Sequence, residues 1–333
     1  MKCLNCGDAN IDTSRFCENC GNPLRSELPQ PQLVAPQTSN GHQSCPVCGI
    51  GDLDASGSCG ECGRISRVQV NDCELQVLAP HLASATHRGR THRENQDAVG
   101  FAELADGFAF VVSDGVSSSV GARQAADAAV RVVLEVLKNV DGSGQTPSQK
   151  LQLALDRAHE AICAIPYTAS ADLAEPQATV VAALASADIV HFAWVGDSRL
   201  YLVGAGAPSQ LLTRDDSWLN ELREQGVQVD QAAKDKNAHA ITQCLGMRDA
   251  PPQTHLSQAN LTPGHLVMLC SDGLWNYIED GKVPGEGLEL QQRCQTLVDF
   301  ANAKGGHDNI SVVLFDPSTH QRGHDLDEFR GAC

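Results

Sequence analysis

Three carboxylates beside apolar, strand-like runs are the feature that most constrains how this chain can fold. They are Asp114, Asp272 and Asp308, and each lies at or next to a run rich in Val, Ile and Leu. A side chain at the end of a strand is held by a rigid backbone and can point into a shared cleft. Carboxylates that converge in this way can hold divalent metal ions.

Length and charge limit the function classes that remain. A chain of 333 residues with 42% hydrophobic content can bury one large core, with smaller appendages beside it. The net charge of -17 and the lack of a Lys/Arg-rich run argue against a nucleic-acid-binding surface. We therefore expect no nucleic-acid partner.

The sequence also argues against a membrane protein. The longest apolar stretches, such as 188–194 and 266–270, are far shorter than the roughly 20 residues that a membrane-spanning helix needs. The first residues, Met1 to Cys6, show neither an apolar core nor a cleavage site of a signal peptide. We expect a cytoplasmic protein.

Eight of the 14 cysteines form four Cys-x-x-Cys pairs before residue 63. They are Cys3, Cys6, Cys17, Cys20, Cys45, Cys48, Cys59 and Cys62. Paired thiolates at this spacing are typical of structural, tetrahedral zinc sites, and the alternative of disulfides would suit a secreted protein. We predict two Zn²⁺ ions in two ribbons, residues 1–25 and 44–68. Because four thiolates leave no open coordination position, the ribbons would present a folded surface to a protein partner.

The other six cysteines are scattered, and several lie in apolar runs, which favours buried thiols. A nucleophilic role for Cys270 is the alternative, but no basic residue adjoins it to lower its pKa.

The rest of the chain divides by composition. Residues 26–43 form a Pro/Gln/Ser-rich linker, residues 81–316 a large domain, and residues 317–333 a polar tail. Runs typical of strands are 107–113, 178–184, 189–195, 199–203, 266–270 and 310–315, and helical spacing occurs in 120–140, 148–165 and 290–303. This pattern predicts an α+β fold with mostly antiparallel sheets.

From about residue 85 to 315 the chain resembles the metal-dependent serine/threonine protein phosphatases of type 2C. The resemblance rests on Gly89 to Asp97, Val111 to Gly115, Ala178-Thr179, Val195 to Arg199, Leu212 to Asp215, Leu245-Gly246, Cys270 to Gly273 and Gly306 to Ser311. It implies two antiparallel β-sheets sandwiched between helices, with a metal centre at one end of the sheets.

The resemblance also implies the ligands of that centre. Asp114 would bridge two metal ions, one of which the carbonyl of Gly115 also binds, and Asp272 and Asp308 would bind the other. Such oxygen ligands suit Mn²⁺ or Mg²⁺. Asp197 would hold a third, weaker ion with Asp272, unless it only caps its turn and pairs with Arg199.

The segment that ends in Asn95-Gln96-Asp97 departs from the family. His92 stands where the family has an arginine that clamps the substrate phosphate, so either His92 or a neighbour, Arg90 or Arg93, would bind phosphate. Gln96 replaces the glutamate that precedes Asp97 and holds a metal-bound water, which would lower metal affinity. Asp216 stands where the family often has histidine.

Residues 217–240 correspond to the flap beside the site. Six acidic residues in and before it would disfavour acidic phosphopeptides, unless the segment is only a solvated loop: Asp215, Asp216, Glu221, Glu224, Asp230 and Asp235.

The function that this resemblance implies is hydrolysis of phosphoserine and phosphothreonine by a metal-activated water. The partners would be phosphorylated proteins and, as the opposing enzyme, a serine/threonine kinase. The alternative is a catalytically weakened scaffold that binds phosphoproteins. Ribbons that sense nucleic acid are a third hypothesis, which their few basic residues disfavour.

Overall fold

The computed structural model describes residues 2, 73–78, 81–140, 144–170, 173–186, 188–204, 206, 208–227, 229, 239–262 and 264–318. The chain divides into two units, Met1–Asp72 and Cys73–Cys333. Apart from Lys2, the predicted ribbons and linker lie outside the described residues, as do all eight predicted zinc ligands and the tail beyond residue 318.

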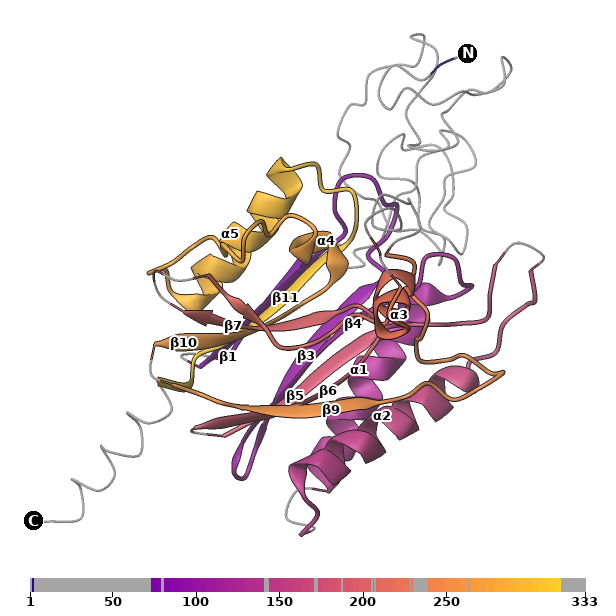
Figure 1. Ribbon diagram of the computed structural model, residues 1–333, viewed down its shortest axis with the longest axis horizontal. Helices are drawn as coiled ribbons and strands as arrows, with labels where there is room; N and C mark the ends of the chain where they lie inside the picture. Colours follow the sequence, from indigo (N-terminus) through magenta and orange to yellow (C-terminus); the bar gives the residue numbers. More distant parts are fainter. Residues whose placement is uncertain are drawn as a thin grey trace, which may run out of the picture. The chain divides into compact units, whose positions relative to one another are not determined.

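Two antiparallel sheets form the centre of the second unit (Figure 1). The first has the order β1-β2-β11-β10-β7-β8, with β1 (Cys73–Leu78), β2 (Leu82–His87), β11 (Ile310–Phe315), β10 (His265–Cys270), β7 (Arg199–Gly204) and β8 (Gln210–Leu211). The second has the order β3-β4-β5-β6-β9, with β3 (Asp97–Leu104), β4 (Gly107–Asp114), β5 (Val180–Ala185), β6 (Ile189–Val195) and β9 (His255–Asn260).

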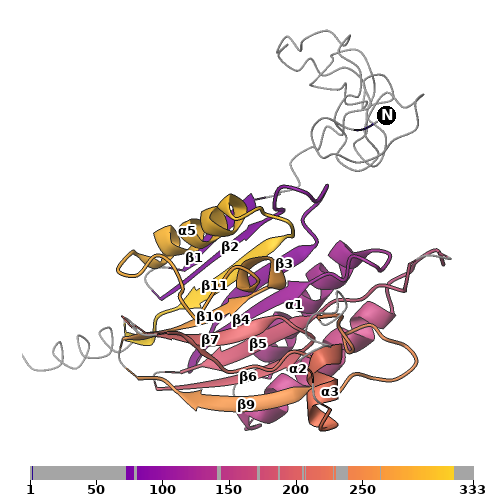
Figure 2. The same cartoon turned by 45° about the horizontal axis from the view of Figure 1, so that its top comes forward.

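Helices cover the outer face of each sheet (Figure 2). Helices α1 (Ala122–Asn139) and α2 (Pro147–Cys163) pack on the second sheet, and α4 (Asp272–Trp275) and α5 (Leu290–Ala303) pack on the first. A fifth helix, α3 (Trp218–Glu224), lies in the long connection between β8 and β9. The predicted fold of two antiparallel sheets between helices is therefore confirmed.

The core lies in three apolar layers because each sheet buries both of its faces. Between the sheets, Phe110 of β4 stacks on Phe315 of β11 with ring centroids 5.5 Å apart. The outer layers are rich in small residues, especially alanines, on the side of α1 and α2. Gly100 of β3 allows this close packing, because a Cβ there would lie 2.7 Å from a methyl carbon of Val130 in α1.

The start of α2 follows from its local sequence. Thr146 accepts a hydrogen bond from the backbone of Gln149, whose side chain bonds the backbone of Thr146 in return, and Pro147 is the first helical residue. This capping box satisfies backbone donors that a helix leaves unpaired at its first turn.

Each strand and helix expected from apolar runs is present, with ends shifted by at most two residues. The sequence patterns did not indicate β1, β2, β3, β8, β9, α3 or α4. Strand β2 is rich in small and polar residues, and four of the six side chains of β9 are exposed, so neither shows the usual strand signal. Strand β1 pairs with β2 and begins before residue 81.

Within the part of the chain that the structure describes, we find no helix of the length and apolar character that crossing a membrane requires.

Candidate metal centre

Five aspartates meet at one end of the sandwich because of where their elements begin and end. Asp97 opens β3 and pairs in register with Asp114, the last residue of β4. Asp272 opens α4 two residues after the end of β10, and Asp308 lies two residues before β11. Asp197 lies in the turn between β6 and β7. The structure therefore brings together all five carboxylates that the sequence singled out.

Ser271 links the two sheets at this end. Its hydroxyl donates to Asp97 Oδ2 over 2.7 Å and accepts from the backbone of Ser311 over 3.0 Å. Both Ser271 and Ser311 are fully buried. No local sequence signal indicates this role of Ser271, because its partner Asp97 lies 174 positions away in the chain.

Burial and mutual repulsion make the carboxylates hard to ionise together. Burial away from water is the larger cause and the charges of neighbouring aspartates are the smaller one. Together they raise the pKa of Asp97 to about 7 and the pKa of Asp272 to about 7. The same two causes raise the pKa of Asp114 and of Asp197 well above the ordinary range. A group of acids in this state needs either protons or cations to neutralise it.

Three carboxylate oxygens at the centre are buried without a hydrogen-bond partner: Asp97 Oδ1, Asp197 Oδ1 and Asp272 Oδ1. A buried, unpaired carboxylate oxygen is costly, and a divalent cation is the partner that its charge and hardness favour. In the described part of the chain, no three His, Cys, Asp or Glu side chains lie close enough together to hold a metal ion by themselves. The donor set thus fits Mn²⁺ or Mg²⁺, with water completing the coordination.

Gly115 follows Asp114 at a position where no side chain fits. A Cβ there would lie 2.3 Å from the carbonyl oxygen of Ala122, and the Gly115 amide donates to the backbone oxygen of Gln96 over 3.2 Å. The backbone beside Asp114 is therefore held in close contact with α1 and with the start of β3, as a backbone ligand requires.

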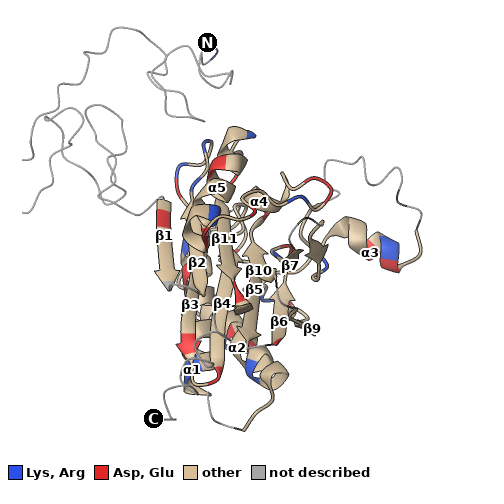
Figure 3. Cartoon of the chain, turned by 90° about the vertical axis from the view of Figure 1, so that its left-hand side faces the viewer, with Lys and Arg blue, Asp and Glu red and all other residues tan. Residues whose placement is uncertain are grey.

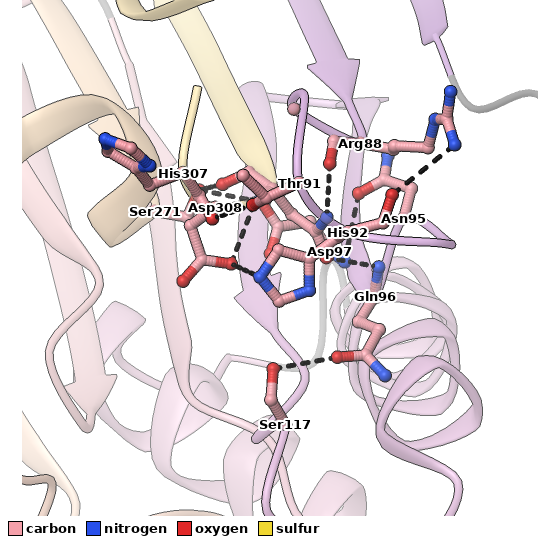
Figure 4. A network of polar contacts seen from close by, with 12 residues as sticks. Arg88, Thr91, His92, Asn95, Gln96, Asp97, Ser117, Ser271, His307 and Asp308 are labelled. Carbon is pink, nitrogen blue, oxygen red and sulfur yellow. Dashed lines mark hydrogen bonds and ion pairs between the residues drawn. The ribbon is translucent and has the colours of Figure 1, made fainter. Parts of the chain in front are cut away.

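His92 faces the candidate ligand Asp308 (Figure 4). Its Nε2 lies 3.2 Å from Asp308 Oδ1, and the side chain is 28% exposed. Two further hydrogen bonds join the loop that bears His92 to the loop that bears Asp308. The Arg90 amide donates to the backbone oxygen of Gly306 over 2.7 Å, and the Thr91 hydroxyl donates to the backbone oxygen of His307 over 2.5 Å. Arg93 is exposed on the same loop.

Asn309 holds this loop from inside. Its Oδ1 accepts from the Gln96 amide over 2.7 Å, and its Nδ2 donates to the carbonyl oxygens of Arg88 over 2.8 Å and Glu94 over 3.0 Å. Asn309 belongs to the motif Gly306 to Ser311, but its role could not be predicted from the sequence, since only the fold shows which backbone groups it reaches.

Gln96 is held at both ends of its amide, and Figure 4 shows the contact of its side chain with Ser117. The Ser117 hydroxyl donates to Gln96 Oε1 over 2.9 Å, and Gln96 Nε2 donates to a Glu94 oxygen over 3.2 Å. The neutral side chain at this position therefore has a neighbouring carboxylate, Glu94.

Asp197 does not rely on Arg199 for a partner. Arg199 donates to both carboxylate oxygens of Asp215, over 2.9 and 2.7 Å, and its guanidinium lies 3.5 Å from the centre of the Trp275 ring. Trp275 Nε1 in turn donates to the backbone oxygen of Asp197 over 2.9 Å. The backbone of Asp197 is thus fixed while its carboxylate remains available.

The acidic residues of the flap region differ in surroundings. Asp215 and Asp216 are 6% and 5% exposed and bond inside the molecule, so they do not form part of an acidic surface. On α3, Glu224 pairs with Arg214, and the helix carries both signs of charge (Figure 3). Asp230 and Asp235 lie outside the described residues. The described residues thus show no uniformly acidic flap.

Cys270 is fully buried, and burial raises the pKa of its thiol strongly. A protonated thiol without solvent access is not a nucleophile. Cys244 and Cys294 are also buried free thiols, whereas Cys163 is half-buried and Cys73 is exposed.

Comparison with protein families agrees with this geometry. Residues 85–311 match the family model of protein phosphatase 2C, and residues 2–24 match that of a zinc-ribbon domain.

Individual relatives match over different lengths. The serine/threonine phosphatase stp of Listeria innocua is 28% identical over 254 residues, which cover 74% of this chain and 99% of that protein. A protein of Streptococcus pyogenes described as of the protein phosphatase 2C type is 34% identical over 140 residues, covering 41% of this chain and 54% of the relative.

Solved structures include the catalytic domain of the serine/threonine protein phosphatase PstP in complex with two manganese ions. It is 26% identical, with a TM-score of 0.54, and the match covers 71% of this chain and 96% of that one.

Proposed function

The chain belongs to the protein phosphatase 2C family, and from this membership we propose that it hydrolyses phosphoserine and phosphothreonine in proteins as a metal-dependent phosphatase. The observation that carries the proposal is the group of mutually repelling carboxylates with three buried, unpaired oxygens. A module that only binds phosphoproteins would have no need for such a group, because its repulsion costs stability.

The carboxylates are the groups that would hold the metal ions. Asp114, the carbonyl of Gly115, Asp272 and Asp308 would hold two Mn²⁺ or Mg²⁺ ions, and Asp197 with Asp272 would hold a third, weaker ion. When bound, the ions activate a water molecule and offset the negative charge of the phosphate. Asp97, fixed by Ser271, and Gln96, fixed by Ser117, orient the water.

The phosphate itself meets the loop of residues 88–94. His92 donates to Asp308, so it orients a metal ligand. The exposed Arg93 and Arg90 supply positive charge to the substrate phosphate.

The N-terminal unit has a separate task. Four cysteines in each ribbon, residues 1–25 and 44–68, hold one Zn²⁺, and the ribbons bind a protein partner. The match to a zinc-ribbon family supports this assignment for the first ribbon. A serine/threonine kinase is the counterpart of the phosphatase. The buried free thiols of Cys244, Cys270 and Cys294 support a reducing compartment, the cytoplasm.

The experiment that tests the function measures phosphate release from a phosphothreonine peptide with no added metal, with Mg²⁺ or with Mn²⁺. We expect turnover that requires one of these ions. Asp114→Ala should lower it by more than about 100-fold, since loss of a bridging ligand must exceed the 10- to 100-fold typical of its supporting residues.

Asp106→Ala is the matched control, because Asp106 lies in the hairpin at the opposite end of β3 and β4. It should keep full activity and metal dependence. Turnover that persists in Asp114→Ala would refute the assignment of the centre. Absence of turnover with every ion, in folded protein, would favour the phosphoprotein-binding alternative.

A further inference from the structure

Asp216 is a buried acid for which the proposed reaction has no use. It is 5% exposed and lies where the chain leaves the first sheet to form the flap, residues 217–240. The two ends of the flap lie side by side here. Ser217 forms an isolated β-bridge with Ile241, and the Thr242 amide donates to the carbonyl oxygen of Asp216 over 2.9 Å.

The carboxylate of Asp216 connects two parts of the second sheet. Its Oδ2 accepts from the amide of Gly196 over 2.8 Å, and its Oδ1 lies 2.7 Å from Nε2 of His255. Gln243 Nε2 is a more distant neighbour of Oδ1, at 3.5 Å. The Asp216 amide also donates to the carbonyl oxygen of Gly196, over 3.0 Å.

His255 is itself held by the sheet. It opens β9, pairs in register with Trp194 of β6, and stacks on the indole ring with centroids 4.9 Å apart. Its side chain is 16% exposed. A ring packed in this way can move little, so it sets the position of the Asp216 carboxylate.

Gly196, the other partner, comes directly before Asp197. Its φ is 99°, and a Cβ there would lie 2.7 Å from Cβ of Thr179, so the turn has one tight backbone conformation. A shift of the Gly196 amide would displace the carboxylate of Asp197.

We propose that Asp216 and His255 are a positioning pair, which holds the turn bearing Asp197 and the base of the flap in one arrangement. The inference rests on the proposed function for the task of Asp197. The contacts connect the base of the flap to the turn that bears Asp197 through the buried Asp216 carboxylate and through the backbone hydrogen bond of the same residue.

Two substitutions of His255 separate its hydrogen bond from its packing. His255→Phe keeps an aromatic ring against Trp194 but removes the donor to Asp216. His255→Gln keeps a donor on a side chain of similar reach but removes the ring. Asp216→Asn, of unchanged size, removes the charge and serves as a second way to weaken the pair.

The first measurement is hydrogen exchange of backbone amides in the metal-free protein. In His255→Phe the Gly196 amide should exchange about tenfold faster, because a hydrogen bond to a charged group loses its support. The β4 amides, such as that of Val111, should keep their rates. His255→Gln should resemble the unchanged protein.

The second measurement is the Mn²⁺ concentration that gives half-maximal phosphatase activity. It should rise about tenfold in His255→Phe and Asp216→Asn, with kcat at saturating Mn²⁺ within about twofold of the unchanged protein. His255→Gln should restore the native value.

Unchanged Gly196 exchange in both His255→Phe and Asp216→Asn would overturn the proposal. Equal behaviour of His255→Phe and His255→Gln would also do so, since it would assign the effect to packing. If His255→Phe unfolds, Asp216→Asn decides between these results. Failure of the phosphatase function itself would appear as absent turnover while the exchange pattern persists.

Discussion

At the scale of single residues, His92 departs most from the type 2C pattern, since it contacts a candidate metal ligand instead of standing open to a phosphate. A histidine supplies one donor, whereas an arginine supplies a planar fork for two oxygens. In the proposed site, His92 would therefore orient Asp308 rather than clamp the substrate phosphate.

We expect His92→Arg to lower KM for a phosphothreonine peptide by about three- to tenfold, because a fixed bidentate donor would face the phosphate. The value of kcat should stay unchanged or rise. His92→Gln, which keeps one donor towards Asp308, is the control and should leave KM near its native value. A larger loss of kcat in His92→Arg than in His92→Gln would show instead that the contact with Asp308 dominates.

At the scale of elements, the site depends on how closely α4 approaches the loop before β11. Gly273 is the second residue of α4, and a Cβ there would lie 1.9 Å from the backbone oxygen of Asn309. The same Cβ would lie 3.3 Å from Cβ of Asp308. This contact sets the separation of the two candidate ligands Asp272 and Asp308.

Gly273→Ala should therefore lower the free energy of unfolding by at least about 2 kcal/mol, since backbone cannot yield as a flexible side chain can. It should also weaken Mn²⁺ binding. Gly264→Ala, in the turn before β10, is the control: its φ of 87° strains a side chain, but its surroundings are open. For Gly264→Ala we expect the free energy of unfolding to fall by about 1 kcal/mol and the Mn²⁺ affinity to stay native. Denaturant unfolding with and without Mn²⁺ measures both, and equal Mn²⁺ affinities in the two variants would contradict the argument.

At the scale of the whole molecule, the carboxylate group makes stability depend on pH and on metal. An aspartate in the unfolded chain has a pKa of about 3.9. Asp97 and Asp272 have raised pKa values of about 7 in the folded protein. Between these values the folded state binds more protons than the unfolded state, so stability falls as pH rises.

Without added metal, the unfolding temperature should therefore decrease between pH 5 and pH 8. Mn²⁺ should raise it more at pH 8 than at pH 5, because the ion replaces the protons that neutralise the group at lower pH. Scanning calorimetry at both pH values measures the effect.

Asp114→Asn tests the cause, because it removes one charge without changing the size of the side chain. Its unfolding temperature at pH 8 without metal should exceed that of the unchanged protein, and its response to Mn²⁺ should be much smaller. A native response to Mn²⁺ in this variant would place the ion elsewhere.

Apolar periodicity in the sequence predicted most of the strands and helices, and the resemblance to type 2C phosphatases implied their layers and the carboxylates of the site. Apolar periodicity predicts strands such as β6 and β11 and helices such as α5, because it is a property of a short stretch of chain. Asp114 and Asp272 could be singled out because each is adjacent to such a stretch. Strands β1 and β9 could not be predicted from apolar periodicity, since both lie at sheet edges, where a strand needs little apolar surface.

Only the tertiary structure decided which side chains meet. Arg199 bonds Asp215 rather than Asp197, Asp216 lies inside rather than on an acidic flap, and Ser271 reaches Asp97 across the sandwich. Each of these partners lies between 16 and 174 positions away along the chain. Burial and hydrogen bonding depend on distance in space, and local sequence encodes the elements but not the distances between them.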